Sequence, residues 1–169
     1  MDNILAQGIG GIAFLVGVMA FWQKDDMRFR YQMVAFCCIM GIHFALLGAT
    51  VAAIGVVING MRSFASIKTH SRRVMCFFIA LMWLMTLPNI THFFEFMTVF
   101  GSSVATWAQF SKHGVALRSL ILFNSLCWVS HNIWLGSIGG TLVESTFIVT
   151  NLMTIYRLKQ VSKNQQLHS

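Results

Sequence analysis

The segment HFALLG (His43–Gly48) returns later in the chain as HNIWLG (His131–Gly136), with histidine, leucine and glycine at the same positions. The correspondence continues towards the N-terminus, because Arg30 and Arg118 each stand twelve intervening residues before their histidine. Such an ordered series of identities predicts that one structural unit is written twice. The alternative is that apolar helices of similar composition align by chance.

The correspondence also continues towards the C-terminus. Asn59-Gly60-Met61 aligns with Asn151-Leu152-Met153 when four extra residues, 137–140, are accommodated as a longer turn in the second copy. Both asparagines then lie at a similar depth in their units. We therefore expect the first copy to span 1–67 and the second to span 90–158.

The composition indicates a membrane protein. The chain has 169 residues, of which 56% are hydrophobic and 10% charged, and its mean hydropathy is +0.68. Soluble domains contain about 25% charged residues, and a soluble chain this short cannot bury so much apolar surface. The net charge of +7 could indicate nucleic-acid binding, but the cations lie in short loops between apolar runs, which indicates membrane topology instead.

The apolar runs divide into seven predicted membrane spans, each near the required length of about 20 residues. The run 31–61 is too long for one helix and is divided at Gly48, and the run 119–156 is divided at 136–140. Pro88 divides the run 74–111, because proline disfavours helix at the preceding residue. The predicted spans are 4–22, 31–47, 50–66, 73–88, 90–110, 117–135 and 139–157.

The basic residues support this count. All twelve Lys and Arg fall in the loops 23–30, 62–73 and 111–118 or in the segment after 156, whereas the N-terminus and the other loops contain none. The positive-inside rule then predicts an external N-terminus and a cytoplasmic C-terminus. We expect 159–169 to form a polar cytoplasmic tail, disordered over its last residues, SKNQQLHS.

The predicted fold is all-α, with seven transmembrane helices in a three-plus-one-plus-three arrangement. Three spans form each copy, and the connector helix at 68–89 lies between the copies. A single connecting span gives both copies the same orientation, so the repeat is parallel and its axis runs along the membrane normal.

This arrangement resembles the SWEET/MtN3-like superfamily of sugar and small-solute transporters. FWQKDD at 21–26, the pair Asn59 and Arg62, and WLGSIGGTLVE at 134–144 resemble more closely the YgjV-type bacterial inner-membrane proteins, over nearly the whole chain. The resemblance implies a multi-pass inner-membrane protein that carries a small solute by alternating access, and it also implies self-association. The chain departs from the SWEET-like pattern because its single proline, Pro88, lies outside the first helix of each copy.

Four residues are the candidate substrate contacts. SWEET-like transporters carry asparagine at places that correspond to Asn59 and Asn151, and an amide suits hydroxyl-rich solutes. Met40 and Trp128 align across the copies, and an aromatic ring at that depth could stack on a sugar or another ring. The alternatives are an interhelical hydrogen bond for the amides and simple packing for Met40 and Trp128.

His43, His131 and Glu144 are candidates for a proton-carrying or gating group. Both histidines are predicted near the outer ends of their helices, with Glu144 at a depth similar to that of His131. Histidine titrates near neutral pH, so a His131–Glu144 pair could carry a proton. The alternative is a structural pair in the outer leaflet.

Enzymatic motifs are absent from the sequence. It contains no GxSxG, HExxH or Walker sequence, and its four cysteines lack metal-binding spacing. We therefore predict no catalytic residues, no metal and no cofactor. The expected partners are the lipid bilayer and a small polar solute, and nucleic acid is not expected. The alternative to a transporter is a non-transporting scaffold or accessory subunit.

Overall fold

The computed structural model describes residues 2–21, 26–69, 71–112 and 114–167, and these residues form an all-helical bundle. Among them are seven α-helices and one short 3-10 helix, η1, at positions that correspond to the seven predicted spans and the proline turn. The helices are α1 (Asp2–Phe21), α2 (Asp26–Leu46), α3 (Thr50–Lys68), α4 (Arg72–Thr86), η1 (Leu87–Asn89), α5 (Phe93–Ser111), α6 (Gly114–Leu135) and α7 (Ile138–Leu167).

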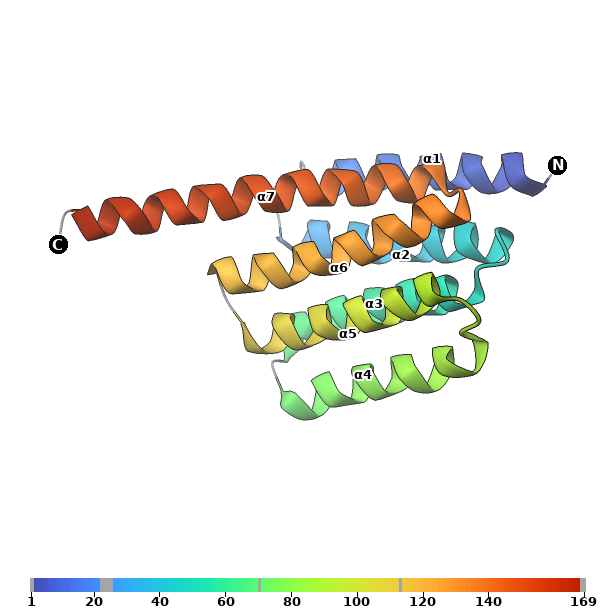
Figure 1. Ribbon diagram of the computed structural model, residues 1–169, viewed down its shortest axis with the longest axis horizontal. Coiled ribbons are helices and arrows are strands. Elements are labelled where there is room, and N and C mark those ends of the chain that lie inside the picture. The colour runs from blue at the N-terminus through green and yellow to red at the C-terminus, as the bar shows by residue number, and fades with distance from the viewer. Residues whose placement is uncertain (1, 22–25, 70, 113, 168–169) are drawn as a thin grey trace.

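The α-helices run up and down, so that successive helices are roughly antiparallel (Figure 1). Helix α2 packs against both α1 and α3, and α6 packs in the same way against α5 and α7. The two groups of three meet where α1 contacts α7 and where α3 contacts α5. Helix α4 lies outside this arrangement, against α3 and α5.

The repeated Leu-Gly pair ends a helix in both halves of the chain. Gly48 and Gly136 have φ angles of 72° and 73°, a left-handed conformation that glycine adopts without a Cβ penalty. The same hydrogen bond follows each glycine: Ala49 N donates to Phe44 O at 2.9 Å, and Ser137 N donates to Asn132 O at 2.9 Å. The opening sequence motif is therefore a helix-termination signal used twice.

The chain turns between α4 and α5 by a different device. Pro88 lies in the first turn of η1, where its missing N–H costs no hydrogen bond. His92 and Glu95 then form a capping box at the start of α5, and the Glu95 carboxylate accepts hydrogen bonds from Thr91 N at 2.8 Å and His92 N at 3.0 Å. The predicted break at Pro88 is confirmed as a turn.

The basic residues of the described chain gather at one end of the bundle. They lie where α2, α4 and α6 begin, where α3 and α5 end, and along the last third of α7. The N-terminus and the turns after α2, α4 and α6 occupy the opposite end (Figure 1). We call these the basic end and the N-terminal end.

Apolar side chains cover the outside of the bundle. Every α-helix exposes large ones, among them Ile4 at 81%, Leu84 at 69% and Phe93 at 70% exposure. One stretch, Ile138–Gln160 in α7, is long and apolar enough to cross a membrane by length and composition, with a mean hydropathy of 1.3. Apolar stretches in the first three helices are shorter: Ile4–Met19, Tyr31–Leu46 and Thr50–Ala65.

The predicted tail differs from the structure. Helix α7 continues to Leu167, so residues 162–167 are helical where a disordered segment was expected. The physical reason is local: no glycine or proline occurs between 141 and 167, and Lys, Gln, Leu and Arg all favour helix. The polar composition was therefore a poor guide to backbone order.

Candidate functional site

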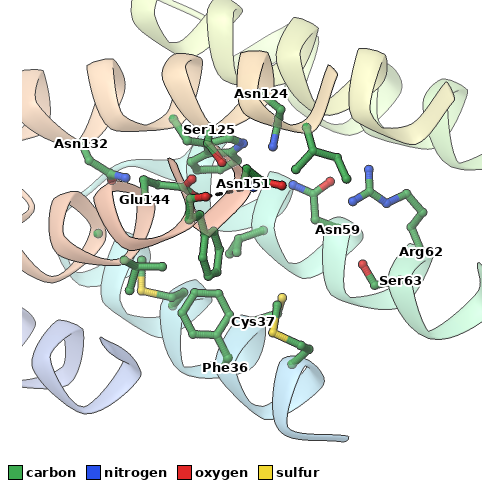
Figure 2. A pocket seen from close by; sticks show the side chains of 18 of the residues that line it. Phe36, Cys37, Asn59, Arg62, Ser63, Asn124, Ser125, Asn132, Glu144 and Asn151 are labelled. Atoms are coloured by element: carbon green, nitrogen blue, oxygen red, sulfur yellow. Dashed lines mark hydrogen bonds between the residues drawn. The ribbon is translucent and has the colours of Figure 1, made fainter. Parts of the chain in front are cut away.

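A cavity of about 220 Å³ lies between the two groups of three helices. Its apolar walls include Phe36, Met40 and Phe44 from α2 and Trp128 from α6. Polar side chains from four helices, α3, α5, α6 and α7, complete the lining (Figure 2). They are Asn59, Arg62, Ser63, Gln109, Arg118, Asn124, Ser125, Asn132, Glu144 and Asn151.

The structure brings the four predicted substrate contacts together. Asn59, Asn151, Met40 and Trp128 all line this one cavity, although they come from four different helices. Met40 and Trp128 are almost wholly buried, so their surfaces in the cavity are small. Their role in binding remains a prediction, but their common location is now established.

Ser102 of α5 holds two of the cavity side chains in place. Its hydroxyl accepts hydrogen bonds from Asn59 Nδ2 at 3.1 Å and from Trp128 Nε1 at 3.0 Å, and it faces Asn124 Oδ1 at 3.4 Å. These contacts use both acceptor sites and the donor of the hydroxyl group. Among the described residues, Asn59 Oδ1 is buried without a partner, and so is Asn132 Oδ1 of the same lining.

The second asparagine has different partners. Asn151 Nδ2 donates to the carbonyl oxygen of Phe147 on its own helix at 2.9 Å, and its Oδ1 accepts from Arg118 at 3.4 Å. The two asparagines share a cavity but not a hydrogen-bonding pattern. At Asn59 a solute would therefore meet an acceptor atom without a partner, whereas both amide atoms of Asn151 already have hydrogen-bond partners.

Arg62 points into the protein and not towards the lipid. It is 5% exposed, and its Nη1 donates to Ser102 O at 3.2 Å and to Thr106 Oγ1 at 2.6 Å. Nε is buried without a partner. Figure 2 shows the guanidinium group on the same side of the cavity as Asn59. Arg157, in contrast, is exposed.

Glu144 lies towards the other end of the cavity in Figure 2. Its carboxyl group makes a hydrogen bond with the Ser125 side chain, while Oε2 is buried and has no partner. It is the one acidic side chain among the residues that line the cavity in the described chain. The cavity therefore has a cationic and an acidic end, joined by amides.

The two histidines lie outside the cavity lining. His43 is fully buried, and its ring nitrogens lie 2.7 Å from Ala6 O and 2.6 Å from Ser137 Oγ. Because a carbonyl only accepts, Nδ1 is the donor and the neutral ring accepts from Ser137 through Nε2. His131 is equally buried among aromatic rings, and neither of its nitrogens has a partner.

The expected pair of His131 and Glu144 is not formed as a hydrogen bond, since both ring nitrogens of His131 are unpartnered. The two side chains differ in their depth along the helices and in the direction in which they point. Glu144 lies well inside α7 and contacts Ser125, whereas His131 lies in the last turns of α6 and contacts the rings of Phe44 and Trp134.

The N-terminal end of the cavity is closed by contacts between α1 and the turn after α6. Gln7 donates to Gly136 O at 2.7 Å and accepts from Ile138 N at 3.0 Å. Gly10 and Gly139 touch through their backbones, and a Cβ at either position would collide with a neighbour. Together with the bond between His43 and Ser137, these contacts form what we call the N-terminal latch.

Comparison with known proteins places the chain in a family. The model of the Imp-YgjV family, described as bacterial inner membrane proteins, matches residues 4–162. This chain belongs to the Imp-YgjV family. Inner membrane protein YgjV of Escherichia coli is 39% identical over 159 residues, which cover 94% of this chain and 87% of that protein. No solved structure matches the chain. Its location is therefore the bacterial inner membrane.

Several cavity residues of this Imp-YgjV protein were missed by sequence reasoning. Asn124 and Asn132, which line the cavity, and Ser102, which binds lining side chains, are polar residues inside apolar stretches. That signal could have identified them, because polar groups in a bilayer need partners. The charge pattern predicts Arg62 only as one of the cations on the cytoplasmic side. No sequence signal distinguishes an inward-facing arginine from one that faces lipid headgroups.

The described residues contain no group of three or more His, Cys, Asp or Glu side chains that could hold a metal ion. The four cysteines are free thiols. Cys37 lines both the cavity and an apolar groove on the outer surface, whereas Cys127 is buried against Gly101 and lines neither. This difference provides two native reporters for the accessibility of the cavity.

Proposed function

We propose that this protein is a small-solute transporter of the inner membrane that works by alternating access. The observation that carries the proposal is the cavity between the two groups of helices, lined by amides and closed at one end by the N-terminal latch. Membrane proteins do not bury so many polar groups together without a partner for them, since each costs free energy in an apolar surrounding.

The packing of the helices supports a parallel repeat of three, one and three helices. If α1, α2 and α3 correspond to α5, α6 and α7, the contact of α1 with α7 corresponds to the contact of α5 with α3. Both contacts are present, as a two-fold relation requires. In this proposal each of the seven helices crosses the membrane, with the N-terminus outside and the basic end in the cytoplasm.

The contacts at the two ends suggest which way the cavity faces. At the N-terminal end Phe44, His43 and Asn132 are at most 1% exposed. Towards the basic end the lining includes Gln109 and Ser63, which are partly exposed, and Arg118, which is exposed. The present conformation is therefore the inward-facing one, and outward opening would require the N-terminal latch to break.

Native cysteines provide the test. In a background that retains Cys37 alone, we expect a charged, membrane-impermeant thiol reagent to react from the cytoplasmic side of inverted membrane vesicles. The rate should exceed that from the periplasmic side of right-side-out vesicles, because the N-terminal latch excludes the reagent. Mass spectrometry of the purified chain would measure the modified fraction.

Two matched variants control for other routes. A chain that retains Cys127 alone should resist the reagent, because this thiol is 1% exposed and outside the cavity. A chain that retains Cys38 alone should also resist it. This exposed thiol lines the same outer apolar groove as Cys37 but not the cavity, so it controls for entry of the reagent through that groove. Equal resistance of Cys37 from both sides would contradict transport and favour the alternative, a scaffold or accessory subunit.

A further inference from the structure

We propose that the cavity selects a small zwitterionic solute, with its carboxylate at Arg62 and its ammonium group at Glu144. This inference rests on the proposed transport function and narrows its substrate from small polar solutes to one pattern of charge. A neutral sugar, the substrate class implied by the SWEET-like resemblance, satisfies neither charged group.

The first support is the uncompensated charge of Arg62. Within the described chain its hydrogen bonds go to neutral oxygens, those of Ser102 and Thr106. A buried charge without an opposite charge is costly, and a guanidinium group presents paired N–H donors that match a carboxylate. Its buried Nε lacks a partner, so an anionic group would complete its hydrogen bonds. Arg118 adds a second cation to the lining.

The second support is Glu144, at the other end of the lining. Its Oε2 atom is buried and unpartnered, so a donor with positive charge would satisfy it. Helix α7 rises about 1.5 Å per residue, which places Glu144 roughly 10 Å along α7 from Asn151, towards the N-terminal end. Arg62 lies roughly 5 Å along α3 from Asn59, towards the basic end. The two charges therefore face the cavity from opposite directions.

The third support is what lies between the charges. Asn59 offers a free acceptor, Oδ1, and Figure 2 shows Asn59, Asn124 and Asn151 between Arg62 and Glu144. Amides can bind the polar middle of a solute without adding charge. A solute without charges would leave Arg62 and Glu144 uncompensated, and this penalty gives the cavity its selectivity.

Four-carbon solutes that differ only at their ends test the charge pattern directly. Binding of γ-aminobutyrate, γ-hydroxybutyrate and butanediol with terminal hydroxyls to the purified full chain in lipid nanodiscs would be measured by isothermal titration. We expect the dissociation constant to be lowest for γ-aminobutyrate, by about tenfold over γ-hydroxybutyrate and more over butanediol, since each charged hydrogen bond contributes a factor of about ten or more.

Two variants separate the ends of the solute. Arg62→Met should weaken γ-aminobutyrate and γ-hydroxybutyrate alike, by about tenfold or more. Glu144→Gln should weaken γ-aminobutyrate by a similar factor and leave γ-hydroxybutyrate unchanged, because only the former carries an ammonium group. Arg157→Met is the matched control, since that arginine is exposed, and it should bind as the unaltered chain does. Arg62→Lys keeps the charge, so it should retain part of the affinity if Arg62→Met fails to fold.

Three results would overturn the inference. The first is butanediol or D-glucose binding as tightly as γ-aminobutyrate. The second is Glu144→Gln weakening both acids equally, and the third is none of the solutes binding. The transport proposal is judged separately, by the reactivity of Cys37 from each side. A tight glucose site together with a reactive Cys37 would refute the charge pattern and leave transport standing.

Discussion

The two contacts between the halves, α1 with α7 and α3 with α5, occupy corresponding places but are built differently. The first is a close backbone contact at Gly10 and Gly139, and its hydrogen bonds among the described residues join Gln7 of α1 to Gly136 and Ile138 at the N-terminal end. The second is a contact between polar groups, in which Ser102 accepts hydrogen bonds from Asn59 and Arg62. The first contact joins the halves at the N-terminal end, and the second contributes side chains to the cavity lining.

The two histidines of the repeated motif show the same divergence. His43 receives a partner from the other half, Ser137, which follows the glycine of the second motif. The corresponding residue after the first glycine is Ala49, which has no hydroxyl, and His131 has no partner on either nitrogen. The same sequence motif therefore has different hydrogen bonding in the two halves, because serine follows one glycine and alanine follows the other.

The largest effect is expected from a substitution that breaks the contact of α1 with α7. Gly139→Leu forces a side chain into the backbone of Gly10, so we expect a loss of at least about 3 kcal/mol of unfolding free energy. Unfolding in mixed detergent micelles, followed by circular dichroism, would measure it. Gly11→Leu on α1, next to Gly10 and at a position where a Cβ meets nothing within 4 Å, should change stability little. Equal losses would show that the glycine contact is not specific.

Removing the hydroxyl group of Ser102 tests the contact of α3 with α5. Ser102→Ala leaves Asn59 and Trp128 without their acceptor, which should cost about 2–3 kcal/mol of unfolding free energy. It should also increase the reactivity of the Cys37 thiol, because Trp128 is no longer held. Ser145→Ala, at an exposed position, is the control. An unaltered stability would mean that water replaces the hydroxyl group and that this contact is loosely built.

Replacing each of the two histidines should change the unfolding free energy in a different way. His43→Leu removes two hydrogen bonds and should lower the unfolding free energy by about 1–2 kcal/mol. His131→Leu removes two unpartnered buried nitrogens, so stability should be unchanged or higher. Thermal unfolding curves of the two variants, compared with each other, would measure these effects. Similar losses for both would show that His131 has a partner, such as water, in the membrane.

The smallest expected effect comes from restoring the missing partner. Ala49→Ser places at the end of α2 the hydroxyl group that Ser137 provides after α6, so it should raise the unfolding free energy by about 1 kcal/mol if His131 accepts it. The double variant with His131→Leu should lose this gain. A gain that persists without the histidine would refute the proposed two-fold correspondence of these positions.

Much of the helical arrangement could be predicted from particular residues. Gly48, Gly136 and Pro88 end helices for local reasons, and the structure confirms turns at all three. The shared location of Asn59, Asn151, Met40 and Trp128 followed from alignment of the two copies. The prediction that His131 pairs with Glu144 was wrong as a contact, because similar sequence depth does not fix the direction in which a side chain points.

The sequence by itself determined an apolar chain, the turns that divide its helices and the end of the bundle that carries its cations. These properties depend on composition, on glycine and proline, and on residue order, all of which act locally or through the membrane. Only the tertiary structure decided that Arg62 faces inward while Arg157 faces outward, and that Ser102 binds two cavity side chains. Those features depend on which helix faces meet, and a bundle of similarly apolar helices offers many such faces.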